Sequence, residues 1–304
     1  MIRFGLCCLF YREPVKFRTA TATAVLKLSK KERLKRLSAL CLENADSLHR
    51  ALRYCADNGI GCFRVTSQFW PLKTHPEAGY ALTDLPDFER ISETLKKCGR
   101  FAGENDIRTT FHPDQFIVLN SPRLHIVKNA VGELDYQAEV AELIGADVIN
   151  VHAGGAYGDK ISALETLRKN LSLLPERVRA RLTFENDDRI FTPEDILPLC
   201  RSEKLPFVYD IHHHRCHGDG LTPETATEMA LATWDREPLF HISSPLAGWS
   251  GPWPHRHHDF INIRDFPKFW EKLDITVEIE AKAKEVAIKK LQESLKKRRQ
   301  RAGR

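Results

Sequence analysis

The chain has 304 residues, 42% of them hydrophobic and 29% charged, and its 46 Lys and Arg side chains against 41 Asp and Glu give a formal net charge of +5. This composition is typical of a globular protein and excludes a disordered or fibrous chain. No apolar run approaches the roughly 18 residues of a membrane helix. Tyr11, Arg12 and Glu13 interrupt the first apolar stretch too early for a signal peptide, so we expect no membrane insertion.

The cysteines indicate a cellular compartment and the basic residues indicate a kind of partner, but neither indicates a reaction. Eight cysteines are scattered through the expected strands and helices, which favours reduced thiols in a cytoplasmic protein over a disulfide framework. Much of the positive charge lies in the last stretch, KKLQESLKKRRQRAGR. Such a tail permits a polyanionic partner, although a solvated helix end explains it at least as well.

Short apolar runs rich in β-branched residues alternate with longer stretches whose apolar residues recur at three- and four-residue spacing. The short runs predict strands and the long stretches predict helices. We expect eight strands, at residues 3–8, 62–65, 108–111, 148–152, 182–185, 207–209, 239–242 and 275–278, and helices that include 43–59, 87–105 and 133–147.

Alternating strands and helices predict an α/β fold, a single TIM-type (β/α)8 barrel. We expect the barrel to occupy residues 1–283 and a basic C-terminal helix end and tail to occupy 284–304. Residues 245–258, with three prolines and two tryptophans, are expected to form one long loop.

Side chains that can bind a metal recur where the expected strands finish, and in such barrels these strand ends form the active-site face. A single histidine at a strand end is more often structural, but six strand ends that all carry His, Asp or Glu indicate a shared site. Burial of so many ionisable groups without partners would cost several kcal/mol each. The predicted ligands are His112, His152, Glu185, Asp210 with His213, His241 and Glu280.

Mixed imidazole and carboxylate ligands suit zinc, manganese or iron better than magnesium or calcium. So many ligands exceed the need of one ion, so we expect two or three ions with Glu185 and Glu280 as bridging ligands. That arrangement is typical of phosphodiester hydrolysis. Two histidine clusters leave alternatives open: His212, His214 and His217 are expected to be bystanders, and one of His255, His257 and His258 is expected to supply a loop ligand.

Two loops after strands carry further candidates. In FHPDQF, residues 111–116, Gln115 and Phe116 could form a wedge that fills the gap left by a displaced base, or Phe116 could simply pack under the loop. In VHAGGAYGDK, residues 151–160, three glycines would let the backbone approach a ligand or a phosphate, and Lys160 is a candidate DNA contact. The glycine order fits neither the dinucleotide fingerprint nor the Walker pattern.

Six motifs in this order and spacing resemble the UV damage endonuclease family: FHPDQFIVLNSP, HAGGAYGDK, FENDDR, YDIHHH, FHISSP and IEAKAKE. The resemblance covers nearly the whole chain. It implies a barrel of the endonuclease IV type, an endodeoxyribonuclease that cleaves damaged double-stranded DNA immediately 5′ to UV photoproducts and some other lesions and so starts excision repair. It also implies two or three divalent ions, manganese above all and otherwise zinc or cobalt, and no obligate protein partner. The protein would act in the cytoplasm, on the nucleoid.

The resemblance implies a division of the ligands among three ions. His112, His152 and Glu185 would hold one ion, Glu185 with Asp210, His241 and Glu280 a second, and His213 with His257 a third. It favours His257 over His258 and makes Glu185, Glu280, His112 and His75 the catalytic residues. Gln115 and Phe116 match the pair that probes the lesion, where many relatives have Tyr in place of Phe116.

Two positions depart from the family pattern. Leu239 stands where the family often has a carboxylated lysine, so that modification is excluded here. Leu6 stands where some members have an active-site tyrosine.

Three other functions fit parts of the same pattern. The first is a metal-dependent sugar isomerase or epimerase on the same barrel, since fold alone does not separate it from a nuclease. The second is a catalytically silent damage-binding protein, which the intact Glu185 and Glu280 argue against. The third is an abasic-site endonuclease that differs only in the lesion it reads.

Overall fold

A closed barrel of eight parallel strands forms the centre of the computed structural model, which describes residues 1–302. Each strand pairs with the next in the sequence and β8 pairs with β1, so the predicted (β/α)8 barrel is confirmed. Five strands match their expected bounds and the other three shift or extend by one residue. The strands are β1 (Ile2–Cys7), β2 (Cys62–Val65), β3 (Arg108–Phe111), β4 (Val148–His152), β5 (Leu182–Glu185), β6 (Phe207–Asp210), β7 (Leu239–Ile242) and β8 (Ile275–Ile279).

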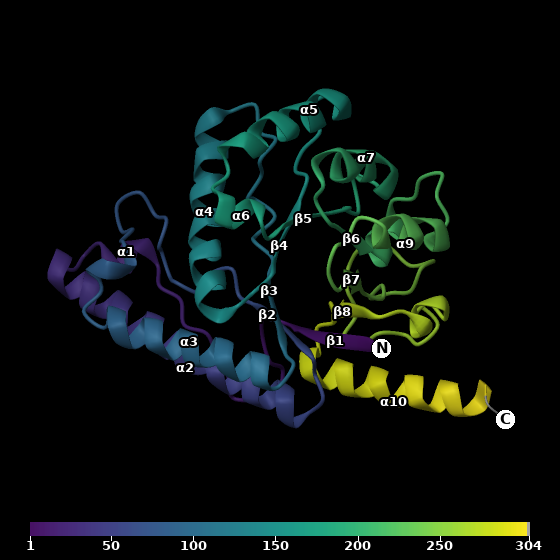
Figure 1. Cartoon of the computed structure of the whole chain (residues 1–304), viewed down its shortest axis with the longest axis horizontal. Helices are drawn as coiled ribbons and strands as arrows, with labels where there is room; N and C mark the ends of the chain where they lie inside the picture. Colours follow the sequence, from purple (N-terminus) through teal and green to yellow (C-terminus); the bar gives the residue numbers. More distant parts are fainter. Residues whose placement is uncertain (303–304) are drawn as a thin grey trace.

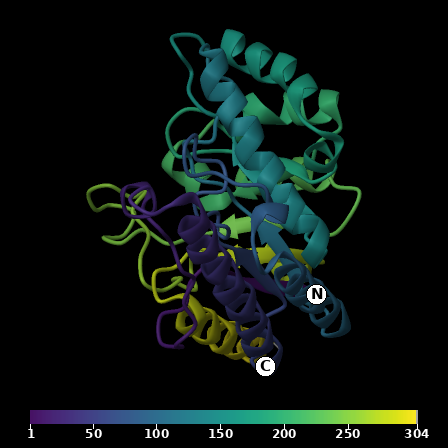
Figure 2. The same cartoon turned by 90° about the vertical axis from the view of Figure 1, so that its left-hand side faces the viewer.

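Helices surround this barrel (Figures 1 and 2). The α-helices are α1 (Ala22–Val25), α2 (Lys30–Asp57), α3 (Phe88–Glu104), α4 (Leu124–Ile144), α5 (Lys160–Asn170), α6 (Glu176–Arg179), α7 (Pro193–Glu203), α8 (Ile211–Cys216), α9 (Pro223–Leu231) and α10 (Lys284–Ala302). Short 3-10 helices are η1 (Leu82–Asp84), η2 (Leu171–Leu173) and η3 (Phe269–Lys272). Residues 245–258 contain no helix or strand, as expected, apart from an isolated bridge between Pro245 and His257.

Local sequence signals explain where several helices begin and end. Ser29 accepts a hydrogen bond from the Glu32 backbone N–H, and the Glu32 carboxylate accepts from the Ser29 backbone N–H, which forms a capping box that starts α2. Thr222 caps α9 ahead of a proline in its first turn. Helix α4 ends at Gly145, whose φ of 73° lies in the left-handed region that glycine adopts readily.

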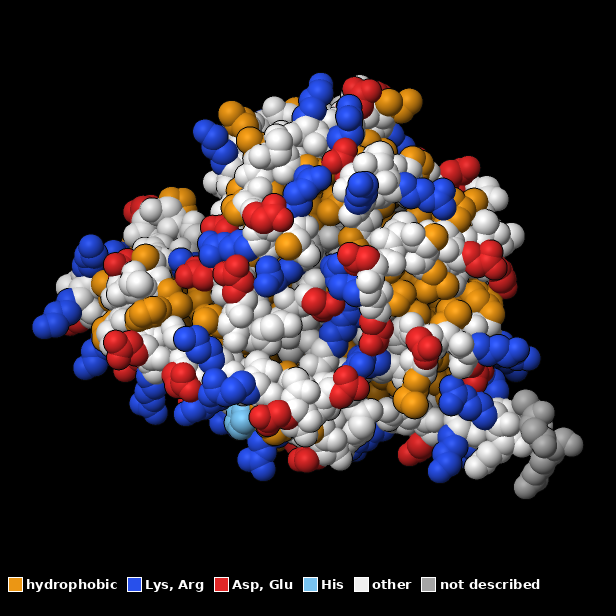
Figure 3. Space-filling model, in the orientation of Figure 1, with side chains coloured by type: hydrophobic (Ala, Val, Ile, Leu, Met, Phe, Trp, Pro, Cys, Tyr) orange, Lys and Arg blue, Asp and Glu red, His pale blue; other side chains and the backbone are white. Residues whose placement is uncertain are grey.

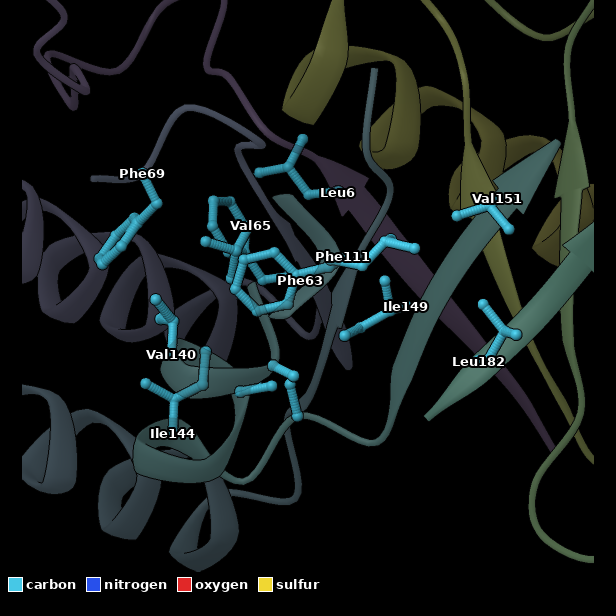
Figure 4. Close-up of a cluster of buried hydrophobic side chains, with 14 of the residues drawn as sticks. Leu6, Phe63, Val65, Phe69, Phe111, Val140, Ile144, Ile149, Val151 and Leu182 are labelled. Carbon is cyan, nitrogen blue, oxygen red and sulfur yellow. The ribbon is translucent and has the colours of Figure 1, made fainter. Parts of the chain in front are cut away.

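The outward side chains of the strands pack against the helices in an apolar layer. Figure 4 shows part of this layer, where Phe63, Phe111 and Ile149 of neighbouring strands lie near Val140 and Ile144 of α4. All five side chains are at most 1% exposed. Because successive strand residues point to opposite faces, the alternate residues point into the barrel, where they form the candidate site.

Helix α10 contacts β1 and β8, and its buried face carries Ala287, Ile288, Leu291 and Leu295. Its outer face carries most of the predicted basic stretch, whose last two residues lie outside the described part of the chain. Figure 3 shows Lys and Arg side chains spread over α2 and α10 with acidic side chains among them, not gathered into one patch. Within residues 1–302 no helix combines the length and hydropathy needed to cross a membrane. All eight cysteines are unpaired, as expected.

Candidate metal centre

The barrel brings the predicted strand-end ligands together at one end of its interior. His152, Glu185 and Asp210 are the last residues of their strands, and His112 and Glu280 directly follow theirs. The described residues include three overlapping groups whose ligand atoms lie within 4.8 Å of one another. These groups are His112, His152 and Glu185; His112, His241 and Glu280; and Glu185, Asp210 and His213.

Glu185 lies at the middle of this cluster and is fully buried. Its Oε2 lies 3.0 Å from His112 Nε2 and 4.0 Å from His152 Nε2. Its Oε1 lies 3.0 Å from His241 Nδ1 and 3.4 Å from His213 Nδ1. The two carboxylate oxygens therefore face different pairs of histidines, which is the geometry required of a bridging ligand.

Asp210 and His213 are held close together by the start of α8. Asp210 is the N-cap residue, and its Oδ1 accepts a hydrogen bond of 2.8 Å from the His213 backbone N–H. Its other oxygen, Oδ2, lies 3.6 Å from His213 Nδ1. The cap thus leaves one carboxylate oxygen free to bind an ion.

The loop of residues 245–258 brings His257 to the edge of the cluster. His257 Nδ1 lies 3.8 Å from Glu280 Oε2, and its ring lies 6.3 Å from that of His213. His258 instead accepts a hydrogen bond from the Phe260 backbone N–H, and its ring neighbours the ring of Phe260. The geometry therefore favours His257 as the loop ligand.

Two buried atoms in the cluster have no hydrogen-bond partner, and both belong to predicted ligands. They are His152 Nδ1 and Asp210 Oδ2. An unpaired buried carboxylate oxygen is costly, so Asp210 Oδ2 fits a missing partner such as a metal ion, whereas His152 faces Glu185 with its other nitrogen, Nε2. The imidazoles and carboxylates of the cluster together form a donor set that suits manganese, zinc or iron.

Opposite charges in the cluster shift one another's pKa values. Burial alone would raise the pKa of Glu185, but the surrounding histidines, His241 first, hold it well below its ordinary value. Burial alone would lower the pKa of His241, yet the adjacent Glu185 carboxylate raises it to about 10. The pKa of His213 is also raised, against burial, by Asp210 and Glu185. In the metal-free protein these two rings hold protons that a bound ion must displace.

Four polar residues around the cluster were missed in the sequence. Asn150 donates a hydrogen bond to Glu185, and Asn186 bonds the backbone of Asp210. Arg64 and Glu278 lie buried inside the barrel beside His241. Three of them could have been found by alternation, because Asn150 and Glu278 lie two residues before predicted ligands and Arg64 points inward from β2.

Several other histidines do not belong to the ligand groups. His75 follows β2 in a loop and lines a cavity of about 440 Å³, and its Nδ1 accepts hydrogen bonds from two backbone N–H groups. His214 is paired with Asp219 and Tyr209, and burial lowers the pKa of His212 to about 4. None of these histidines belongs to the three ligand groups found in residues 1–302.

The loop after β3 presents Gln115 and Phe116 to solvent, and the Phe116 side chain is 76% exposed. The interpretation that Phe116 packs under the loop is therefore wrong. The local backbone requires glycine at position 154, because its φ is 96° and a Cβ there would meet Asn120. Lys160 forms an ion pair with Asp195, with 2.7 Å between Nζ and Oδ2, which occupies its charge.

The two positions that depart from the family pattern are apolar and fully buried. Leu6 lies in the outward hydrophobic layer, near Val65 in Figure 4, and so points away from the cluster. Leu239 lies inside the barrel, where it packs against Val148 and Val208 below His241. Neither side chain can bind a metal.

Fold and site together define a class, the (β/α)8-barrel proteins with a candidate metal centre at the active-site face. A sequence model of the family described as UV-endonuclease UvdE matches residues 2–302. The UV DNA damage endonuclease of Bacillus velezensis is 34% identical over 312 residues, which cover 97% of this chain and 94% of the relative.

Solved structures agree with the sequence matches. A crystal structure of SacUVDE has a TM-score of 0.86 at 28% identity and covers 98% of this chain and 99% of that one. Endonuclease IV from Thermus thermophilus has a TM-score of 0.62 at 16% identity over 97% and 99% of the two chains, a likeness that shows the fold alone. The chain belongs to the UV damage endonuclease family, as its motifs predicted. It is a repair nuclease for UV damage, and its substrate is DNA.

Proposed function

We propose that this protein hydrolyses the phosphodiester immediately 5′ to UV photoproducts, and next to other distorting lesions such as abasic sites, with two or three divalent ions. Manganese is the ion we favour, and zinc and cobalt are the alternatives. The observation that carries the proposal is the central position of Glu185, whose two buried oxygens face four histidines.

The predicted ligands divide into sets that fit this chemistry. His112, His152 and Glu185 would hold one ion, Glu185 with Asp210, His241 and Glu280 a second, and His213 with His257 a third. When bound, such ions activate an attacking water and stabilise charge on the attacking and leaving oxygens. Glu185, which belongs to the first two sets, would hold those two ions close together, and Glu280 would help to hold the second.

The loop that carries Gln115 and Phe116 supports a role in lesion recognition. The exposed ring belongs to the same short loop as His112, just after the end of β3, so it can enter a weakened base step close to the metal centre. A damaged pair is easier to unstack than an intact one, so a wedge at this position selects damage. The ion pair of Lys160 with Asp195 makes Lys160 a weaker candidate for a phosphate contact.

The proposal is tested by incubating the protein and Mn²⁺ with end-labelled duplexes that carry one UV photoproduct, one abasic site or neither. We expect a single nick directly 5′ to the photoproduct, and weaker nicking at the abasic site. Cleavage at the abasic site alone would replace this proposal with the abasic-site endonuclease. Binding of the damaged duplex without any nicking would support the silent damage-binding protein.

The lesion-reading role is tested by Phe116→Ala. Loss of the stacking ring should weaken binding to the damaged duplex by about 5- to 100-fold and leave the Mn²⁺ content unchanged. Leu173→Ala is a matched control, because Leu173 is also exposed but lies in η2, after α5 has returned to the opposite end of the barrel. Equal losses in both variants, or a loss of Mn²⁺ from Phe116→Ala, would contradict the assignment.

A further inference from the structure

A buried carboxylate that is not a predicted ligand lies inside the barrel beside the metal centre. Glu278 of β8 is 1% exposed. Its Oε2 lies 3.0 Å from His241 Nε2. The Arg64 guanidinium forms an ion pair with the same oxygen, so Glu278 is placed as a carboxylate that accepts hydrogen bonds.

The two nitrogens of His241 face different neighbours. Nδ1 faces the cluster, 3.0 Å from Glu185 Oε1 and 3.6 Å from Glu280 Oε1. Nε2 faces away from it, toward Glu278. A neutral ring carries one proton, so a hydrogen bond from Nε2–H to a carboxylate leaves the Nδ1 lone pair free for an ion.

Arg64 lies close enough to the same nitrogen to favour the opposite tautomer of His241. Its Nη2 lies 2.9 Å from His241 Nε2, and a guanidinium can only donate. Donation to Nε2 would put the ring proton on Nδ1, where it would block an ion. Glu278 opposes that arrangement, because its carboxylate accepts from Nε2 and also pairs with Arg64. Arg64 is left to neutralise Glu278 and to bond Glu280, with 2.7 Å between Nη1 and Oε1.

Other residues in the barrel are arranged around Glu278. The Thr110 hydroxyl donates a hydrogen bond to it, and the Cys62 thiol lies 3.8 Å from its Oε1. Gly5 faces it from β1, and a Cβ at that position would lie 2.8 Å from Glu278 Cγ. The chain therefore provides both the hydrogen bonds and the space that fix this side chain.

We propose that Glu278 is a positioning residue that accepts a hydrogen bond from His241 Nε2 and thereby presents Nδ1 to a divalent ion. The inference rests on the metal centre of the proposed function. It adds a residue that is not itself a predicted ligand and that acts through His241.

The test measures Mn²⁺ affinity, from the free-ion electron paramagnetic resonance signal, in the wild type, Glu278→Gln and Glu278→Asp. The amide keeps the shape but can turn its NH2 toward Nε2, and the aspartate keeps the charge beside Arg64 but withdraws the oxygen by one methylene. Loss of such an orienting partner should weaken Mn²⁺ binding about 10- to 100-fold. Glu278→Asp retains the ion pair and so protects the measurement against misfolding of the amide variant.

Asp219→Asn is the matched control, because Asp219 Oδ1 lies 2.9 Å from Nε2 of His214, a histidine outside the ligand groups. It should lower thermal stability and leave the Mn²⁺ affinity within about twofold. Unchanged Mn²⁺ affinity in both Glu278 variants would overturn the proposal. Failure of the wild type to bind Mn²⁺ would overturn the proposed function instead.

A second measurement uses no substitution at Glu278. Long-range ¹⁵N–¹H correlation spectra of the wild type loaded with Zn²⁺, with His241→Asn for assignment, report the tautomer of His241 directly. We expect the proton on Nε2. A proton on Nδ1 would overturn the inference even if the metal centre forms.

Discussion

The two faces of the barrel strands carry different kinds of side chain, apolar on the outer face and ionisable on the inner face near the strand ends. At the strand ends, Phe184 is followed by Glu185 and Phe240 by His241. The aromatic member of each pair is fully buried in the layer between strands and helices, and its neighbour is fully buried in the barrel. In each pair, one residue stabilises the fold and the next residue in the sequence would bind an ion.

This difference shows that burial has two separate consequences here. On the outer face, burial removes apolar area from water and stabilises the fold. On the inner face, burial holds carboxylates and imidazoles in a medium where each is costly without a partner. Substitutions on the two faces should therefore affect different measurements.

The largest expected effect is that of Glu185→Gln. Removal of the central charge should lower the nicking rate by at least about a thousandfold, because the ions lose their shared ligand. The measurement is single-turnover cleavage of the photoproduct duplex with saturating Mn²⁺. Glu237→Gln is the control, since Glu237 binds Arg3 just before β7, at the opposite end of the barrel, and should keep nearly full activity. Equal activity of the two variants would refute the central role of Glu185.

The neighbouring substitution, Phe184→Ala, should lower the free energy of unfolding by about 3–5 kcal/mol, because it leaves a cavity in a fully buried layer. Urea denaturation measures this loss. At low temperature, where the variant stays folded, its Mn²⁺ content and nicking rate should stay close to those of the wild type. A loss of nicking as large as that of Glu185→Gln would mean that the two faces are not independent.

Mn²⁺ binding should weaken as the pH falls from 8.5 to 6, by about tenfold per unit for each proton displaced. The pKa of His241 is raised to about 10 and that of His213 is raised as well, so both rings are protonated over this range in the metal-free protein. Titration calorimetry in buffers of different ionisation enthalpy would count the protons released. Affinity that does not depend on pH would argue against both rings as ligands.

The same raised pKa values predict the opposite trend for the stability of the metal-free protein. The folded state binds these protons more tightly than the unfolded state, so the contribution is complete below about pH 6.5 and is lost as the pH rises toward 10. Thermal unfolding with and without Mn²⁺ across this range would separate the two trends.

The smallest expected effect is that of Lys160→Ala. Its ion pair with Asp195 is partly exposed, and such pairs contribute at most about 1 kcal/mol to stability. Because the charge is already paired, we expect less than about a threefold loss in DNA affinity at physiological salt. A tenfold loss, measured by fluorescence anisotropy, would restore Lys160 as a phosphate contact.

The barrel and its ring of ligands could be predicted because they follow local rules. Strand bounds follow apolar runs, and Glu185 and His241 lie where such runs end. The partner of Lys160 could not be predicted, since Asp195 belongs to a different helix. Nor could the pairing of Arg64 with Glu278, which are 214 residues apart and meet only when β8 closes the barrel. Long-range pairs of this kind depend on register, and no local pattern encodes it.

The hydrogen bond from Asn120 Nδ2 to the Gly155 carbonyl, 2.7 Å long, joins the loop after β3 to the loop after β4. The first loop carries Phe116 and the second directly follows His152. The bond therefore fixes the spacing between these two loops. Under the proposed function, this spacing would set how many nucleotides separate the base step that the Phe116 ring enters from the phosphodiester that is cleaved.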